Sequence, residues 1–226
     1  AVAKTYYAQK LGVDPRQVTV VSIMPCTAKK FEAKRPEMNS AFHYWKDKLG
    51  LKESDSFQDV DFVLTTREAA RMIKEAGIQF VDLPEESFDE PLGISTGAAV
   101  IFGATGGVME AALRTTYEVL TGQPLGKLEF EDLRGLEGIK TATVNINGAD
   151  IKVAVAHGLA NARKLMEEVR DGRSPYAFIE VMTCPGGCAG GGGQPISTNA
   201  DKLRERIDAI YREDKNKSLR KSHENP

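Results

Sequence analysis

One segment, Glu180 to Pro195, constrains the fold of this chain more than any other. It reads EVMTCPGGCAGGGGQP, with two cysteines four residues apart and then an almost unbroken run of glycine. Six of the eight residues from 186 to 193 are glycine. Glycine adds no side chain to a core and loses the most backbone entropy on folding. We therefore expect the segment where the backbone approaches a bulky group, or where several N–H groups point at one anion.

Both cysteine segments directly follow predicted strands. QVTVVSIM (17–24) leads into Cys26, and YAFIEVM (176–182) leads into Cys184 and Cys188. Both runs are typical of buried parallel strands, because β-branched and apolar residues dominate them. Sites in open α/β sheets collect at the carboxyl ends of strands. We therefore expect the three cysteines to converge at one edge of a sheet.

The remaining pattern alternates strand and helix and predicts an α/β fold: a parallel sheet flanked by helices, with a β-hairpin near 141–157. Thr65 and Glu68 have the spacing of a capping box after a strand at 59–66. Asn147-Gly148 lies between two alternating runs and predicts the hairpin. Further helices are expected from about 108, at 160–170 and at 199–213, while the polar end from 214 is expected to fray.

Composition excludes several classes of function. The net charge is -2, so the chain lacks the basic excess that would indicate binding to nucleic acid or to an anionic membrane surface. No apolar run reaches the roughly 18 residues of a membrane span. The chain starts without Met or an apolar signal core, and we expect it to be cut from something larger. Three cysteines are too few for a disulfide scaffold, which favours a reducing, cytoplasmic compartment.

Several chemistries compete for the cysteines. Ordinary buried thiols remain an alternative, most of all for Cys26. Structural zinc would need a second ligand pair, and of the three histidines only His157 lies at a strand end. A redox disulfide usually has C-x-x-C spacing. Thiolate ligation of an iron–sulfur cluster fits better, although a cubane needs four thiolates and the chain has three cysteines.

Other features are weaker. Lys29 lies three residues beyond Cys26, but a solvated position is the plainer interpretation of a single lysine. GATGG (103–107) is similar to a phosphate-binding loop before a helix, yet it lacks the Lys-Ser/Thr of a P-loop. Met24 and Met182 would ordinarily be core residues, although each stands two residues before a cysteine.

Together these segments resemble the catalytic domain of the [FeFe]-hydrogenases. MPCTAKKFE (24–32) is similar to the family signature M-P-C-x-x-K-x-x-E. EVMTCPGGCAGGGGQP is similar to E-x-M-x-C-x-x-x-C followed by G-G-G-Q-P, and GAAVIFGATGGVMEAALR (97–114) is similar to a stretch between them. The resemblance covers essentially all 226 residues.

The resemblance implies an H-cluster, which is a [4Fe–4S] cubane bridged by a cysteine sulfur to a two-iron subcluster. It implies that Cys26 and Cys184 ligate the cubane and that Cys188 ligates it and bridges. Lys29 would donate a hydrogen bond to a cyanide ligand, a charge-assisted contact. The remaining implied site residues line the two-iron pocket (Met24, Met182, Phe102), support the site (Glu32) or bring backbone close to the cofactor (Gly103, Gly106, Gly187, Gly191).

The chain also departs from the family. The first signature, T-S-C-C-P-x-W, supplies the fourth cubane ligand and a proton-passing cysteine, and it is absent from these residues. We therefore expect residues 1–226 to be the C-terminal part of the catalytic domain, truncated at both ends, with an absent or incomplete H-cluster and no activity alone. The expected partners are the remainder of the subunit with its accessory clusters, and ferredoxin or NAD(P)-linked subunits. No nucleic acid and no membrane span are expected.

Two alternatives remain open. Hydrogenase-like cytosolic iron–sulfur assembly factors resemble the hydrogenases around the cysteine motifs, and hydrogen-sensing relatives share the cofactor. Phe102 and the TGGVMEAALR stretch favour a hydrogenase over an assembly factor.

Overall fold

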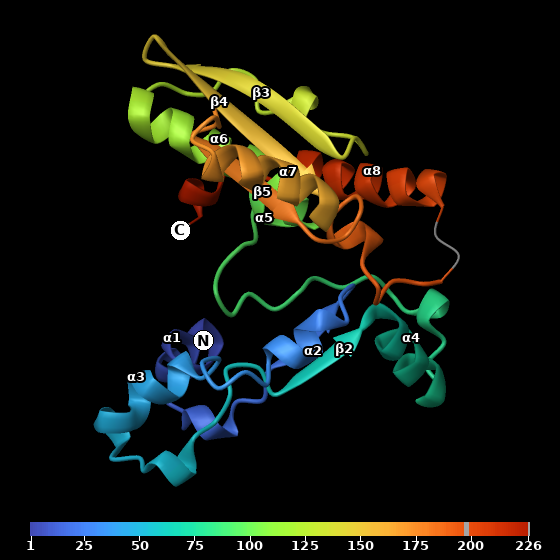
Figure 1. Ribbon diagram of the computed structural model, residues 1–226. Coiled ribbons are helices and arrows are strands. Elements are labelled where there is room, and N and C mark those ends of the chain that lie inside the picture. Colours follow the sequence, from blue (N-terminus) through green and yellow to red (C-terminus); the bar gives the residue numbers. More distant parts are fainter. Residues whose placement is uncertain (197–198, 226) are drawn as a thin grey trace. The chain divides into compact units, whose positions relative to one another are not determined.

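The computed structural model describes residues 1–196 and 199–225. The chain forms two compact units (Figure 1), one comprising Ala1–Leu92 with Gly192–Pro195 and the other Gly93–Gly191 with Ile196–Pro226. The chain therefore passes from one unit to the other inside the glycine run, between Gly191 and Gly192.

The first unit is built around a two-stranded parallel sheet. Val21 lies opposite Phe62 in its register, and Met24 lies opposite Thr65. The helices and strands of this unit are α1 (Tyr6–Leu11), β1 (Val21–Met24), α2 (Ala28–Glu32), α3 (Ser40–Leu49), β2 (Phe62–Thr65) and α4 (Thr66–Glu75).

Strand β1 is shorter and more exposed than its sequence predicts. The strand expected over 17–24 begins only at Val21, because Pro15–Gln17 form a 3-10 turn capped by Asp14. The side chains of Val21 and Ile23 are 50% and 60% exposed. The prediction of a buried strand is therefore wrong for β1, since one face of this sheet is uncovered in the described part of the chain.

The predicted start of α4 is confirmed. The Thr65 hydroxyl accepts the Glu68 N–H at 3.2 Å, and the Glu68 carboxylate accepts the Thr65 N–H at 2.8 Å. This reciprocal pair satisfies two donors that a helix start would otherwise leave open. A hydrogen bond from Lys30, together with those from Thr65, lowers the pKa of Glu68 to about 2.

The second unit contains a three-stranded sheet in the order β3-β4-β5, with β4 antiparallel to β3 and parallel to β5. The predicted hairpin is confirmed. Asn147 and Gly148 have φ of +52° and +85°, which is the positive pair that a type I′ turn requires. The helices and strands are α5 (Gly97–Val100), α6 (Gly107–Thr121), β3 (Ile139–Ile146), β4 (Ala149–His157), α7 (Leu159–Arg170), β5 (Phe178–Met182) and α8 (Ala200–Asn216).

Strand β4 is the centre of this unit. Val153 and Val155 share a buried apolar core with Met109 of α6. Ala154, on the opposite face of the strand, packs with Leu165 of α7. Because β3 and β5 pair with the two edges of β4 over residues 153–156, these residues are enclosed on every side, whereas the start of the strand at Ala149 and Asp150 is exposed. A third core joins α8 to α5 and α6 through Leu203, Ile207 and Tyr211.

A buried charge network fixes α8 and the residues that follow it. Arg114 donates to both carboxylate oxygens of Asp214 at 2.8 and 2.9 Å, and both side chains are fully buried. Arg220 donates to the same carboxylate at 2.6 Å. Burial alone would raise the pKa of Asp214, but the hydrogen bonds from Arg114 and Arg220 outweigh it and hold the pKa below its ordinary value.

The expectation that the polar end of the chain frays is therefore wrong for the described residues. Leu219 accepts the Gly97 N–H at 2.8 Å, and Lys221 pairs with Glu118 at 2.9 Å. The charges that made this segment look solvated find partners on α6 and α8.

Strands β1 and β5, which precede the cysteines, belong to different sheets. The three cysteines therefore do not follow strands of one sheet, and that prediction is wrong, although both strands are parallel to a neighbour as predicted. Within residues 1–196 and 199–225, no helix combines the length and apolar character needed to cross a bilayer.

Candidate metal centre

The C-x3-C loop leaves β5 as a tight turn held by its own backbone. The Gly187 N–H donates to the Cys184 carbonyl at 3.0 Å, and the Gly191 N–H donates to the Cys188 carbonyl at 2.9 Å. Cys184 is half-buried and Cys188 is exposed, whereas Gly186 and Gly187 between them are buried. The loop thus has buried glycines at its centre and more exposed cysteines on either side.

Space and dihedral angle both require glycine at the centre of this loop. Gly186 and Gly187 have φ of +75° and +87°. A Cβ on Gly187 would lie 2.6 Å from the Thr105 nitrogen and 2.9 Å from the Met182 sulfur. A Cβ on Gly186 would lie 2.6 Å from Leu203. The glycines let the loop sit directly against neighbouring backbone.

Glycine amides that a cofactor could use are occupied by protein oxygens. The Gly106 N–H donates to Glu180 at 2.7 Å, and those of Gly187 and Gly191 close the loop turns. A Cβ on Gly103 would meet Ile210 at 3.0 Å. The N–H groups of Gly106, Gly187 and Gly191 are therefore already used within the protein.

A buried carboxylate on β5 organises the start of α6. Glu180 is 6% exposed and accepts the N–H groups of Gly106 and Met109, each at 2.7 Å. These donors have no partner within the helix, and a negative charge suits the positive end of the helix dipole. In the sequence, Glu180 stands out only as part of a motif. The signal available in the sequence was a charged residue within an apolar strand, which indicates a buried charge with a specific partner.

Lys140 is a second buried charge that the sequence analysis missed. Its ammonium group donates to the carbonyls of Thr105 at 3.0 Å and Gly135 at 3.1 Å, and the residue is 4% exposed. Burial lowers the pKa of Lys140 to about 8, against the opposing attraction of Glu180 and Glu137.

In the first unit, Cys26 lies two residues after the end of β1, and α2 begins two residues later. Its thiol is half-buried and free. Lys29, the second residue of α2, donates from its ammonium group to both carboxylate oxygens of Glu32 at 2.7 Å. Met24, Lys29 and Glu32 line one cavity of about 150 Å³. Three of the side chains predicted for the site therefore share one cavity of the first unit, although Cys26 itself does not line it.

The end of the glycine run packs against the Cys26 segment. The Gly193 N–H donates to the Pro25 carbonyl at 3.0 Å, and the Gly193 carbonyl accepts the Arg67 N–H at 3.3 Å. A Cβ on Gly193 would lie 2.8 Å from the Pro25 carbonyl carbon and 2.9 Å from the Cys26 nitrogen. Gly193 follows Cys188 by only five residues in the sequence.

The predicted site residues thus form two groups, one in each unit. Met24, Cys26, Lys29 and Glu32 belong to the first unit. The second unit contains Met182, half-buried at the end of β5, and Phe102, 47% exposed in a 3-10 turn before α6. It also contains Cys184, Cys188 and the glycines Gly103, Gly106, Gly187 and Gly191.

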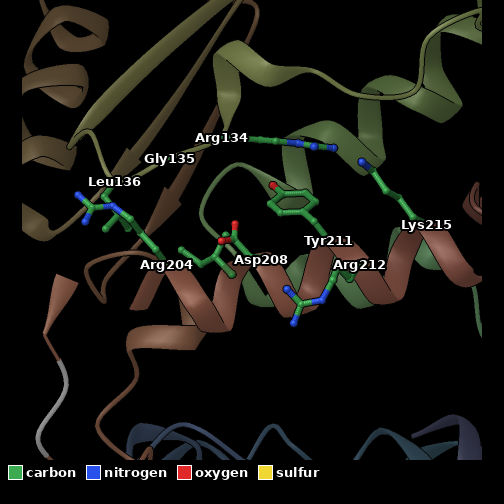
Figure 2. Close-up of a pocket in the computed structure, with 9 residues that line it drawn as sticks. Arg134, Gly135, Leu136, Arg204, Asp208, Tyr211, Arg212 and Lys215 are labelled. Atoms are coloured by element: carbon green, nitrogen blue, oxygen red, sulfur yellow. The ribbon is translucent and has the colours of Figure 1, made fainter. Parts of the chain in front are cut away.

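A separate pocket of about 420 Å³ follows α8 and gathers basic side chains (Figure 2). Arg134 lies over the ring of Tyr211, with its guanidinium carbon 3.9 Å from the ring centroid. Glu110 fixes that guanidinium by accepting hydrogen bonds of 2.7 and 2.9 Å. No residue predicted for the metal centre lines this pocket.

Comparison with known proteins identifies close relatives. Residues 1–192 match the family described as iron only hydrogenase large subunit, C-terminal domain, and residues 200–226 match the iron hydrogenase small subunit family. The chain is 51% identical to the NADP-reducing hydrogenase subunit HndD of Solidesulfovibrio fructosivorans, over 100% of this chain and 36% of that protein. It is 52% identical to the periplasmic [Fe] hydrogenase large subunit of Nitratidesulfovibrio vulgaris, over 91% of this chain and 46% of that protein.

Solved structures of [FeFe]-hydrogenases are also similar to this chain. A structure of an [FeFe]-hydrogenase, described in terms of oxygen inactivation through its H cluster 2Fe subcluster, has a TM-score of 0.76 and 39% identity to this chain. The match covers 100% of this chain and 59% of that one. The mouse cytosolic iron-sulfur assembly component 3 is more distant, at 28% identity over 93% of this chain and 43% of that protein. The chain spans between about a third and a half of the length of these curated relatives.

Proposed function

The chain belongs to the iron-only hydrogenase large-subunit family, and on this premise we propose that it forms the C-terminal part of a catalytic domain that holds an H-cluster. The intact enzyme would interconvert protons and electrons with H₂. Ferredoxin or an NAD(P)-linked subunit would exchange the electrons, and the remainder of the subunit would complete the domain. A cytoplasmic location is proposed from the sparse cysteines, and cell fractionation tests it.

The thiols of Cys26, Cys184 and Cys188 are the proposed iron ligands. Soft sulfur donors suit an iron–sulfur cluster. The observation that carries the proposal is the placement of the glycine run. It begins at the thiol loop of Cys184 and Cys188, and within five residues its backbone packs against the Cys26 segment. Three thiols provide three of the four cubane ligands, so the fourth would come from outside residues 1–226.

When bound, the H-cluster supplies the iron centre at which protons and electrons combine. Lys29 would donate a hydrogen bond to an anionic ligand of that centre, and Glu32 would orient the ammonium group through the bidentate contact. Met24, Met182 and Phe102 would keep the pocket apolar and exclude water. Gly103, Gly106, Gly187 and Gly191 would let backbone approach the cofactor.

A chimera tests the proposed function. Residues 1–226 would replace the matching segment of the solved [FeFe]-hydrogenase, and the product would be matured anaerobically. We expect H₂ evolution with reduced viologen and infrared bands of diatomic iron ligands. Cys26→Ser, Cys184→Ser and Cys188→Ser should each abolish both signals, whereas Ser174→Ala, on a loop before β5, should leave them unchanged.

A folded chimera that binds a [4Fe–4S] cluster but shows no diatomic-ligand bands would contradict the proposal and favour an assembly factor. The 226-residue chain alone should evolve no H₂ after iron and sulfide reconstitution, because it lacks a fourth cysteine ligand. Hydrogen evolution by that chain would overturn the assignment of an incomplete site.

A further inference from the structure

His157 is a buried side chain that the proposed chemistry does not use. It is the last residue of β4 and lies opposite Met182 in the register with β5. It is 8% exposed. The Gly158 N–H, next along the chain, donates to the Met182 carbonyl at 2.8 Å. The imidazole therefore sits at the base of the loop that carries Cys184 and Cys188.

Both ring nitrogens have backbone partners. The Gly186 N–H donates to Nδ1 at 3.2 Å, and Nε2 lies 3.2 Å from the Leu136 carbonyl oxygen. An N–H group can only donate and a carbonyl can only accept. Nδ1 must therefore offer its lone pair, and Nε2 must carry the proton. The contacts select the neutral Nε2–H tautomer of His157.

Gly186 is the midpoint of the C-x3-C loop, and its peptide groups are held from both sides. The Gly186 N–H donates to His157, and the Gly186 carbonyl accepts the Thr105 N–H at 3.1 Å. Gly186 is buried, so an N–H without a partner there would cost the full desolvation of the group. Gly186 also has a φ of +75°, and holding a glycine in one conformation costs more backbone entropy than holding any other residue.

The backbone around the imidazole is itself fixed. The His157 N–H donates to the Gly138 carbonyl at 3.0 Å, and the Asn161 side chain donates to the His157 carbonyl at 2.9 Å. A ring held in this way acts as a rigid support rather than as a mobile contact.

From this geometry we propose that His157 is a positioning residue for the metal-ligating loop. Its Nδ1 acceptor holds the Gly186 peptide and so sets the directions in which Cys184 and Cys188 present sulfur. The link to iron rests on the proposed function, whereas the link to loop geometry stands on these contacts alone.

Three substitutions in the 226-residue chain separate the two hydrogen bonds. His157→Asn keeps an acceptor oxygen at the position of Nδ1 but cannot reach Leu136. His157→Gln keeps a donor at the position of Nε2 but has no acceptor for Gly186. His157→Leu removes both. The readouts are amide hydrogen exchange at Gly186 by NMR, and the alkylation rates of Cys184 and Cys188, with Cys26 in the other unit as the internal control.

We expect exchange at Gly186 to be about five- to tenfold faster in His157→Gln and His157→Leu, the loss expected for one buried hydrogen bond. His157→Asn should stay close to wild type, and alkylation of the two loop thiols should follow the same order. Ring-nitrogen NMR of the wild-type chain should show protonation at Nε2.

Unchanged Gly186 protection in His157→Leu, or rescue by Gln and not by Asn, would overturn the proposal. If His157→Leu fails to fold, the Asn and Gln pair still decides it. Iron binding is measured separately, in the matured chimera. The expected order of loop protection in the 226-residue chain, together with a folded chimera that binds no iron, would support this proposal and count against the proposed function alone.

Discussion

Burial controls the charge of Lys140, and this makes stability depend on pH. Its pKa is about 8 in the folded chain, compared with 10.5 for an exposed lysine. Between these values the unfolded chain binds more protons, so the free energy of unfolding should rise with pH. One pKa unit corresponds to about 1.4 kcal/mol, which bounds the gain at about 3 kcal/mol.

Chemical denaturation of wild type and Lys140→Met at pH 8 and pH 10 measures this contribution. The difference in unfolding free energy should move in favour of wild type as the pH rises, because only wild type has the ammonium group to lose. A difference that is constant with pH would show that Lys140 keeps an ordinary pKa in the fold.

Gly187 permits a second prediction at the scale of one residue. Gly187→Ala should destabilise the chain by about 2–4 kcal/mol, since the added Cβ would be forced against the Thr105 nitrogen and the Met182 sulfur. Gly172 is the matched control. It has a φ of +70° but nothing within 4 Å of an added Cβ, so Gly172→Ala should cost only about 1 kcal/mol. Equal losses in urea denaturation would show that backbone angle, and not crowding, requires glycine at 187.

At the scale of elements, one buried carboxylate connects α6, α8 and the segment after α8. Asp214→Asn should destabilise the chain by about 3–5 kcal/mol, because Arg114 and Arg220 would lose the buried carboxylate that they share and keep only Glu110 and Glu129 as counter-charges. The exposed pair of Arg71 and Glu75 provides the control, and Glu75→Gln should change stability by less than about 0.5 kcal/mol. Thermal unfolding of both variants measures this, and similar small shifts would contradict the structural role given to Asp214.

Local signals predicted the elements whose ends depend on near neighbours. The capping box at Thr65 and the turn at Asn147-Gly148 each formed as expected. Strand β1 did not, because its length depends on the turn before it and its burial depends on what covers the sheet. The prediction that the polar segment after α8 frays was wrong for the same reason, since the partners of that segment lie on α6, about a hundred residues away in the sequence.

At the scale of the molecule, the uncovered face of the β1–β2 sheet predicts self-association of the 226-residue chain. Val21, Ile23 and Phe62 are 50%, 60% and 60% exposed on neighbouring strands. Apolar surface of this kind favours association. Ile23→Thr with Phe62→Thr should shift the chain toward monomer in sedimentation velocity. Val119→Thr, on α6 and 67% exposed, should have no such effect. An unchanged distribution in the double variant would exclude this face as the contact.

Near neighbours along the chain specify its local parts: the cysteine and lysine motifs, the glycine loop, the hairpin and the helix starts. Each depends on chemistry within a few residues. Tertiary structure alone decided that β1 and β5 join different sheets, that Glu180 and Lys140 are buried, and that His157 lies under Gly186. Those outcomes require pairing between segments 25 or more residues apart. Burial and hydrogen bonding at such separations are set by the packing of the whole unit, because no short stretch of sequence specifies which surface will cover it.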